Sequence, residues 1–117
     1  MVNKMEKIEE ETKRVVLSYI KSLDSKKYDQ ASILIDESVK IIGPAGETFG
    51  KPKEFTNMLK RYQGNYSILK MFVEGEDACL LYDFVTPEKI VYMSSWYKVK
   101  GGKIVFIRTV FDPSTFS

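Results

Sequence analysis

The stretch YSILKMFVEGEDACLLYDFVTPEKIVYMSSWYKVKGGKIVFIRTVFDP, residues 66–113, decides the fold class. It contains four runs rich in valine, isoleucine, tyrosine and phenylalanine, whose side chains alternate with the period of two that a β-strand requires. The runs span 66–76, 77–86, 89–100 and 103–113, and the short turns EGED, TPEK and KGGK separate them. Turns this short join antiparallel neighbours, so the stretch predicts a four-stranded antiparallel meander.

Helical patterns precede the meander. From 6 to 23 the apolar residues recur at spacings of three and four, which predicts an amphipathic helix. Asp24 or Ser25 follows as the expected N-cap of a second, shorter helix. The segment VKIIG, residues 39–43, then predicts a short strand. The inner face of the second helix is expected to carry Tyr28, Ala31, Leu34 and Ile35.

A third helix is expected between Pro52, which suits a first helical turn, and Gly64, which suits the position just past a helix end. Its apolar stripe consists of Phe55, Met58, Leu59 and Tyr62. Helices grouped ahead of a meander predict an α+β fold, in which the helices cover one face of a curved sheet.

Composition excludes several function classes. The 117 residues predict one domain, 1–117, with a net charge of +2 and no basic stripe for nucleic acid. The chain has one cysteine, Cys79, and no histidine, which excludes an internal disulfide, a His/Cys metal cluster and a histidine-dependent triad. No apolar run is long enough to span a membrane. We therefore expect a cytoplasmic protein that binds no membrane, nucleic acid, metal or cofactor.

Two segments resemble the nuclear-transport-factor-2-like superfamily, which includes ketosteroid isomerases, SnoaL-like polyketide cyclases and limonene-type epoxide hydrolases. They are VVLSYIKSLDSKKYDQASILIDESVKIIGP, residues 15–44, and WYKVKGGKIVFIRTVFDPSTF, residues 96–116. The resemblance implies a cystatin-like roll: a cone-shaped, strongly bent antiparallel or mixed sheet wrapped around three helices. It also implies a pocket inside the cone and a homodimer formed through the outer sheet face.

The resemblance to the ketosteroid isomerases implies three chemical positions. Those enzymes use a tyrosine and a protonated acid to stabilise an enolate, and a carboxylate to move the proton. Aligned without a gap, the tyrosine position is Tyr19 and the base position is Gly43, which has no side chain. The acid position falls on Ser95, or on Ser94 in a shifted register. The resemblance therefore implies a cone without an evident general base.

Strand alternation, combined with the resemblance, turns Leu80, Tyr82, Phe84, Ile107, Thr109 and Phe111 into the cone. Asp83, Arg108 and Asp112 then lie on the outer face or the rim, and Asp83 is expected to pair with Arg108. A one-residue bulge would turn these residues inward and give a set similar to that of the epoxide hydrolases. Glu47, in the loop PAGETFGKP, would serve as a base only if that loop folds inward.

The leading hypothesis is a protein that binds a small apolar ligand. The expected ligand-binding residues are Tyr19, Phe55, Met58, Leu59, Tyr62, Leu80, Tyr82, Phe84, Ser95, Tyr97, Ile107, Thr109 and Phe111. The alternative is an isomerase, cyclase or epoxide hydrolase that uses Tyr19 and a carboxylate such as Asp83 or Asp112. A protein-interaction module is the third hypothesis. Trp96 is expected to face outward as an interface anchor, and Ile104 to share that outer face with Phe106.

Overall fold

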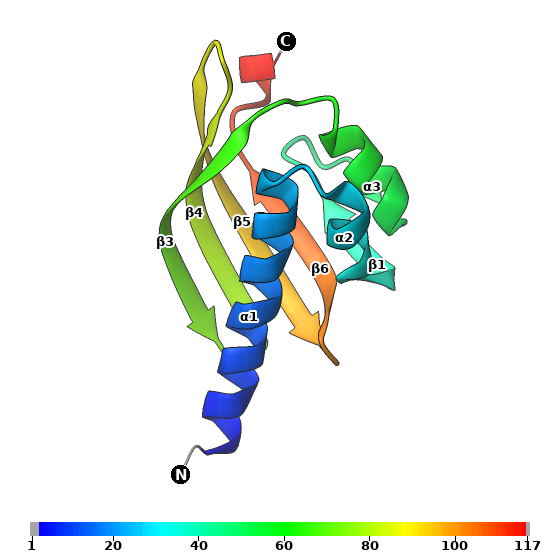
Figure 1. The fold of residues 1–117 in the computed structure, drawn as a ribbon, viewed down its shortest axis with the longest axis vertical. Helices are drawn as coiled ribbons and strands as arrows, with labels where there is room; N and C mark the ends of the chain where they lie inside the picture. The colour runs from blue at the N-terminus through cyan, green and yellow to red at the C-terminus, as the bar shows by residue number, and fades with distance from the viewer. Residues whose placement is uncertain (1–2, 117) are drawn as a thin grey trace.

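Three helices and a six-stranded sheet build the described part of the chain, residues 3–116 of a computed structural model (Figure 1). In chain order the elements are α1 Lys4–Asp24, α2 Tyr28–Ile33, β1 Ile35–Ile42, β2 Thr48–Phe49, α3 Pro52–Leu59, β3 Asn65–Glu74, β4 Asp77–Val85, β5 Ile90–Lys100, β6 Lys103–Val110 and the 3₁₀ turn η1 Pro113–Phe116.

The sheet has the strand order β2-β1-β6-β5-β4-β3. Its β3–β6 part is the predicted antiparallel meander. The β1 strand joins the meander in parallel with β6, with Ile41 opposite Ile107. The sheet is therefore mixed and bends around α1, which lies across one of its faces (Figure 1). The predicted α+β roll is confirmed.

The α1 helix buries one stripe against the sheet, which includes Val15, Val16 and Tyr19. The Asp24 carboxylate, at the end of α1, does not cap α2 as expected. Its Oδ1 instead accepts the backbone N–H of Tyr66 at 2.8 Å. This long-range bond fixes the end of α1 to the start of β3. The N-cap residue of α2 is Lys27, whose side chain makes no capping hydrogen bond.

Two element bounds differ from the sequence prediction. The first strand is longer than VKIIG, because Ile35, expected on the inner face of α2, is already buried in β1. The α3 helix ends at Leu59, and a turn covers the remaining residues before Gly64. Gly64 itself is needed for packing, since a Cβ there would lie 2.6 Å from the Phe84 ring.

A bulge in β6 decides which of its residues face the core. The pairing shifts between Lys98–Phe106 and Val99–Ile104, which leaves Val105 unpaired. Both Ile104 and Ile107 are consequently buried, so the expectation that Ile104 lies on the outer face is wrong. The bulge lies before Phe106, and the pairing from Phe106 to Val110 is regular. Arg108 therefore lies on the outer face, which is where the sequence analysis placed it for an unbulged strand.

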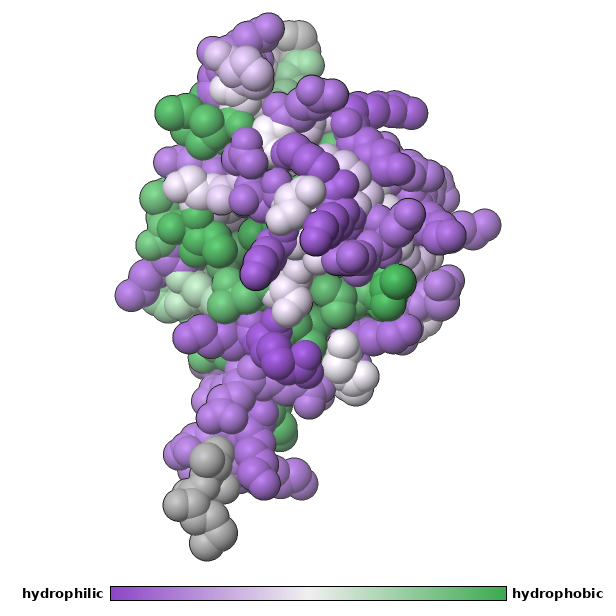
Figure 2. Space-filling model, in the orientation of Figure 1, coloured by the Kyte–Doolittle hydropathy of each residue, from purple (hydrophilic) through white to green (hydrophobic). Residues whose placement is uncertain are grey.

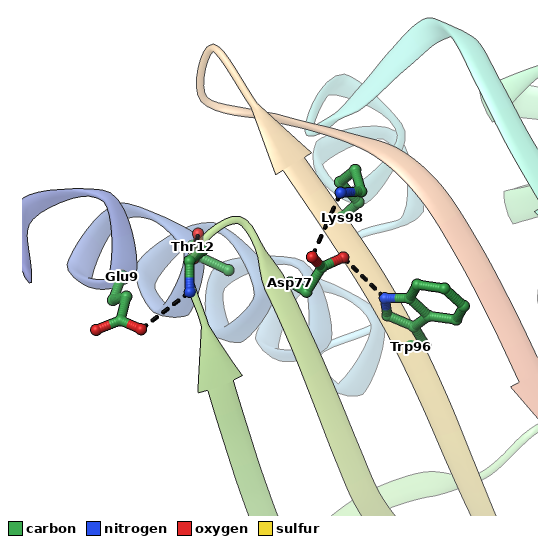
Figure 3. Close-up of polar contacts among 6 residues, drawn as sticks. Glu9, Thr12, Asp77, Trp96 and Lys98 are labelled. Atoms are coloured by element: carbon green, nitrogen blue, oxygen red, sulfur yellow. Dashed lines mark hydrogen bonds and ion pairs between the residues drawn. The ribbon is translucent and has the colours of Figure 1, made fainter. Parts of the chain in front are cut away.

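The outer sheet face carries exposed aromatic side chains at fixed positions. Trp96 faces outward as predicted, and 45% of it is exposed. Its indole N–H donates to Asp77 at 2.9 Å, and Asp77 also pairs with Lys98 at 3.3 Å (Figure 3). The Trp96 side chain is thus held in one orientation.

Figure 3 also shows Glu9 and Thr12 of α1 at the β3–β4 turn. The Glu9 carboxylate accepts the Gly75 N–H, and the Thr12 hydroxyl donates to the Gly75 carbonyl.

Apolar side chains also gather at the left edge of the molecule in Figure 2, over β3. The exposed residues there include Ile68 and Leu69, the second of which lies at a register shift in β3. Between residues 3 and 116, no helix combines the length and the apolar character needed to cross a membrane.

Candidate functional site

A cavity of about 140 Å³ lies between α1, α3 and the inner face of the sheet. Its walls are mostly aromatic and aliphatic. Eleven of the thirteen residues expected from the sequence line it, namely Tyr19, Phe55, Met58, Leu59, Tyr62, Tyr82, Phe84, Tyr97, Ile107, Thr109 and Phe111. The other two, Leu80 and Ser95, are fully buried and lie outside the lining.

A chain of hydroxyl groups lies in the sheet wall of the cavity. The Tyr82 hydroxyl is 2.9 Å from Ser95 Oγ, and Ser95 Oγ is 2.9 Å from Thr109 Oγ1. Tyr82 lies on β4, Ser95 on β5 and Thr109 on β6, so the three hydroxyl groups come from three adjacent strands. Ser95 therefore contributes to the cavity indirectly, by connecting Tyr82 and Thr109, which both line it.

Burial suppresses ionisation of the tyrosines around this chain. It raises the pKa of Tyr82 to about 12, an increase that the hydrogen bond to Ser95 limits. Burial also raises the pKa of Tyr19, Tyr66 and Tyr97 well above the ordinary value, with a further contribution from Tyr82 in each case. All four side chains are neutral hydroxyl groups at physiological pH, able to donate and accept hydrogen bonds.

One wall of the cavity is closed by Phe116, in η1. Its ring contacts Phe111 at 5.5 Å and Tyr62 at 5.0 Å between centroids. The Asp112 carboxylate starts this turn by accepting the Ser114 backbone N–H at 3.0 Å. A second tie is the Lys89 ammonium, which donates to the Thr115 carbonyl. The C-terminal turn therefore serves as a wall of the cavity.

A tight turn forms the rim, from Gly43 to Glu47. The Gly43 N–H donates to the Glu47 carbonyl at 2.8 Å, and the Glu47 carboxylate accepts the Ala45 N–H at 2.9 Å through Oε2. The side chain of Glu47 folds back over Gly43, where a Cβ would overlap the carboxylate. The Glu47 side chain is exposed and lines the cavity at its rim.

No family model matches the sequence, and no curated protein matches it. Many solved structures, in contrast, match the fold. An NTF2-like protein of unknown function from Cytophaga hutchinsonii is 28% identical, with a TM-score of 0.81 over 89% of this chain and 92% of its own. The chain is a nuclear-transport-factor-2-like protein by fold.

Two further neighbours share the fold at lower identity. A structure from Kribbella flavida, provisionally named a ketosteroid isomerase, has a TM-score of 0.80 at 14% identity and covers 88% of this chain and 78% of its own. An LEH-like epoxide hydrolase from M. tuberculosis has a TM-score of 0.74 at 15% identity and covers 87% and 83%. The resemblance seen in the sequence is confirmed at the level of fold.

The carboxylates suggested for catalysis lie outside the cavity of this NTF2-like chain. Asp83 is on the outer side of β4, opposite Tyr92. Asp112 is exposed, and its hydrogen bonds to Ser114 lower its pKa, as expected for a capping residue. Arg108 lies opposite Trp96 and forms no ion pair with Asp83, so the expected pair is wrong.

Ten lining residues were missed from the sequence. Strand alternation could have identified Met93 and Tyr66. Met93 is two residues from Ser95 and therefore faces the same side of β5, and Tyr66 pairs with Phe84. The rim residues had no such signal, since they depend on how a loop folds. The ten are Leu23, Ile41, Ile42, Gly43, Pro44, Glu47, Phe49, Tyr66, Met93 and Phe116.

Proposed function

We propose that this protein binds a small one-ring molecule that carries a hydrogen-bond-accepting oxygen. The observation that carries the proposal is the cavity, in which apolar walls surround the hydroxyl groups of Tyr82 and Thr109. Extensive apolar area with a few placed polar groups is typical of small-molecule sites.

The cavity volume limits the ligand to one ring. It measures about 140 Å³, and an apolar protein cavity of about 150 Å³ holds one benzene molecule. A four-ring steroid needs several times that space. It would have to displace Tyr62 or Phe116, whose rings pack against each other. A compact ring is therefore favoured over a steroid or a long lipid.

The hydroxyl chain determines which polar group is recognised. Tyr82, Ser95 and Thr109 bring three hydroxyl protons, and the two bonds that link them use two. When the two bonds run in the same direction along the chain, the proton at its far end, on Thr109 or on Tyr82, remains for a ligand. A ligand with a carbonyl or ether oxygen accepts it, whereas a pure hydrocarbon leaves it unsatisfied, at a cost of about 1–3 kcal/mol.

Methionine methyl groups provide the test. Met58 and Met93 line the cavity, whereas Met5 and Met71 lie outside it. In NMR titrations we expect acetophenone to shift the Met58 and Met93 methyl resonances and to leave those of Met5 and Met71 unchanged. Ethylbenzene should bind roughly tenfold more weakly, because it accepts no hydrogen bond, and Thr109→Val should reduce this difference. Equal shifts at Met5, Met58, Met71 and Met93, or none at the cavity pair, would contradict the proposal.

A second candidate function is proton transfer at a carbon next to a carbonyl. The observation that favours it is Glu47, whose carboxylate fills the space above Gly43 that the resemblance assigns to a base. The same acetophenone tests it, because its methyl protons exchange with deuterated water. A catalyst would accelerate this exchange by roughly 10²–10⁴, and Glu47→Gln would abolish the acceleration. A binding protein leaves the exchange at the buffer rate.

We also propose that two copies associate through the outer sheet face. Apolar and aromatic side chains remain exposed there although they lie on rigid strands, and Trp96 is held in place by Asp77. A twofold pairing of one such face with itself covers both copies. The exposed residues of this face are Phe72, Ile90, Tyr92, Trp96 and Val110.

A further inference from the structure

The cavity rim presents a carboxylate that the backbone holds in place. The Ala45 N–H binds Glu47 Oε2 at 2.9 Å, and the turn closes through the Gly43 N–H on the Glu47 carbonyl. Oε1 lies in the space over Gly43, which is available only because glycine has no side chain. One carboxylate oxygen is thus fixed by a neutral backbone donor, and the other stays available at the rim.

No cation from the protein neutralises this group. Within residues 3–116 the one ion pair joins Lys98 to Asp77, on the outer face of the sheet. The residues that line the cavity include Glu47 but no lysine or arginine. The remaining lining is rich in aromatic rings such as Phe49 and Phe55, whose faces attract cations. The cavity and its rim therefore favour a positive charge and oppose a negative one.

We infer that Glu47 selects ligands by charge, so that the preferred ligand is a one-ring aromatic molecule that carries a protonated amine in addition to its acceptor oxygen. This inference rests on the proposed function, since it places the ring in the cavity and the ammonium group at the rim against Glu47. The carboxylate is exposed, so water and salt screen the attraction. The contribution of the Glu47 charge is expected to be about two- to fivefold in affinity, as for a solvent-accessible charge pair.

Three probe molecules of similar size measure the selection: benzylamine, benzyl alcohol and benzoate, which are cationic, neutral and anionic. Dissociation constants come from the Met58 and Met93 methyl shifts at neutral pH and low salt. Because benzyl alcohol can also accept a hydrogen bond from the hydroxyl chain, each molecule is compared between the parent protein and Glu47→Gln. This substitution should weaken benzylamine binding by about two- to fivefold relative to benzyl alcohol binding, and should strengthen benzoate binding relative to it.

Glu10→Gln is the matched control. It changes the net charge by the same amount on the exposed side of α1, outside the cavity. The affinity for benzylamine relative to benzyl alcohol should stay as in the parent protein, which separates a local contact from the overall charge. A second measurement needs no variant, because added salt should weaken benzylamine binding and leave benzyl alcohol binding unchanged.

The outcomes separate this inference from the proposed function. If benzyl alcohol binds but Glu47→Gln leaves the affinity for benzylamine relative to benzyl alcohol unchanged, charge selection by Glu47 is overturned and the binding cavity stands. Tightest binding of benzoate overturns the inference in the same way. If none of the three molecules shifts Met58 or Met93, the proposed function and the inference both fail.

Discussion

The carboxylate of Glu47 occupies the space that a side chain at Gly43 would fill, and the Gly43 N–H closes the turn on the Glu47 carbonyl at 2.8 Å. The two residues are therefore coupled: the glycine is required for the placement of the glutamate. A position that the sequence comparison marks as a lost carboxylate thus has a carboxylate beside it, supplied by a residue four positions later.

Gly43→Ala should expel the Glu47 side chain from the rim. The added Cβ overlaps the flexible end of that side chain, which rotates away and gives up the bond to Ala45. We expect a loss of about 1 kcal/mol in the free energy of unfolding, measured from urea midpoints. Gly50→Ala is the control, because a Cβ there meets nothing within 4 Å. Equal stability of the two variants would show that the Glu47 placement contributes nothing.

Ser95→Ala should destabilise the protein by about 1–3 kcal/mol, because it leaves the buried Tyr82 hydroxyl without its partner. Urea unfolding measures the loss. Ser94→Ala is the matched control on the opposite face of β5, where the hydroxyl is partly exposed and lies 3.7 Å from the Cys79 thiol. That change should stay within about 0.5 kcal/mol. Similar losses for both variants would argue against an essential hydroxyl chain.

Stability should fall steeply in alkaline solution. Burial raises the pKa of Tyr82 from its ordinary value to about 12 in the folded state. The unfolded chain therefore releases this proton first, and the stability is fully present below about pH 10 and lost as the pH rises towards 12. Each such tyrosine contributes a slope of about 1.4 kcal/mol per pH unit, and Tyr19, Tyr66 and Tyr97 act in the same direction.

Urea unfolding at a series of alkaline pH values, with tyrosinate absorbance recorded in parallel, measures this slope. Tyr82→Phe should flatten it by about 1.4 kcal/mol per pH unit. Tyrosinate absorbance that rises below the unfolding transition, without loss of structure, would show that these hydroxyls ionise in the folded protein and that the expected slope is wrong.

Tyr92→Asp should convert the proposed homodimer to a monomer. Tyr92 is 59% exposed on the outer face, and a buried carboxylate facing its own copy is strongly unfavourable. Light scattering measures the mass. Ile33→Asp is the control, since Ile33 is 66% exposed but lies on α2, away from this face. A monomeric parent protein, or dissociation by both variants alike, would contradict a dimer formed through the sheet.

The sequence by itself determined the long elements and about half of the cavity lining. Period-two runs predict β3–β6, and their alternation separates two sets of side chains, because side chains in a strand can point only to two sides. The resemblance then implies that Tyr82, Thr109 and Phe111 belong to the inner set. The stripe on α3 likewise identifies Met58 and Leu59 as lining residues. These predictions succeed because a local period fixes the facing of an element before any tertiary contact forms.

The tertiary structure decided what depends on contacts between distant or irregular segments. The parallel pairing of β1 with β6, the bond from Asp24 to the Tyr66 N–H and the bulge at Val105 have no local period that announces them. The placement of Glu47 over Gly43 is of the same kind. A loop has no repeat to fix where its side chains point, so only its hydrogen bonds and the space left by a missing side chain bring that carboxylate to the cavity.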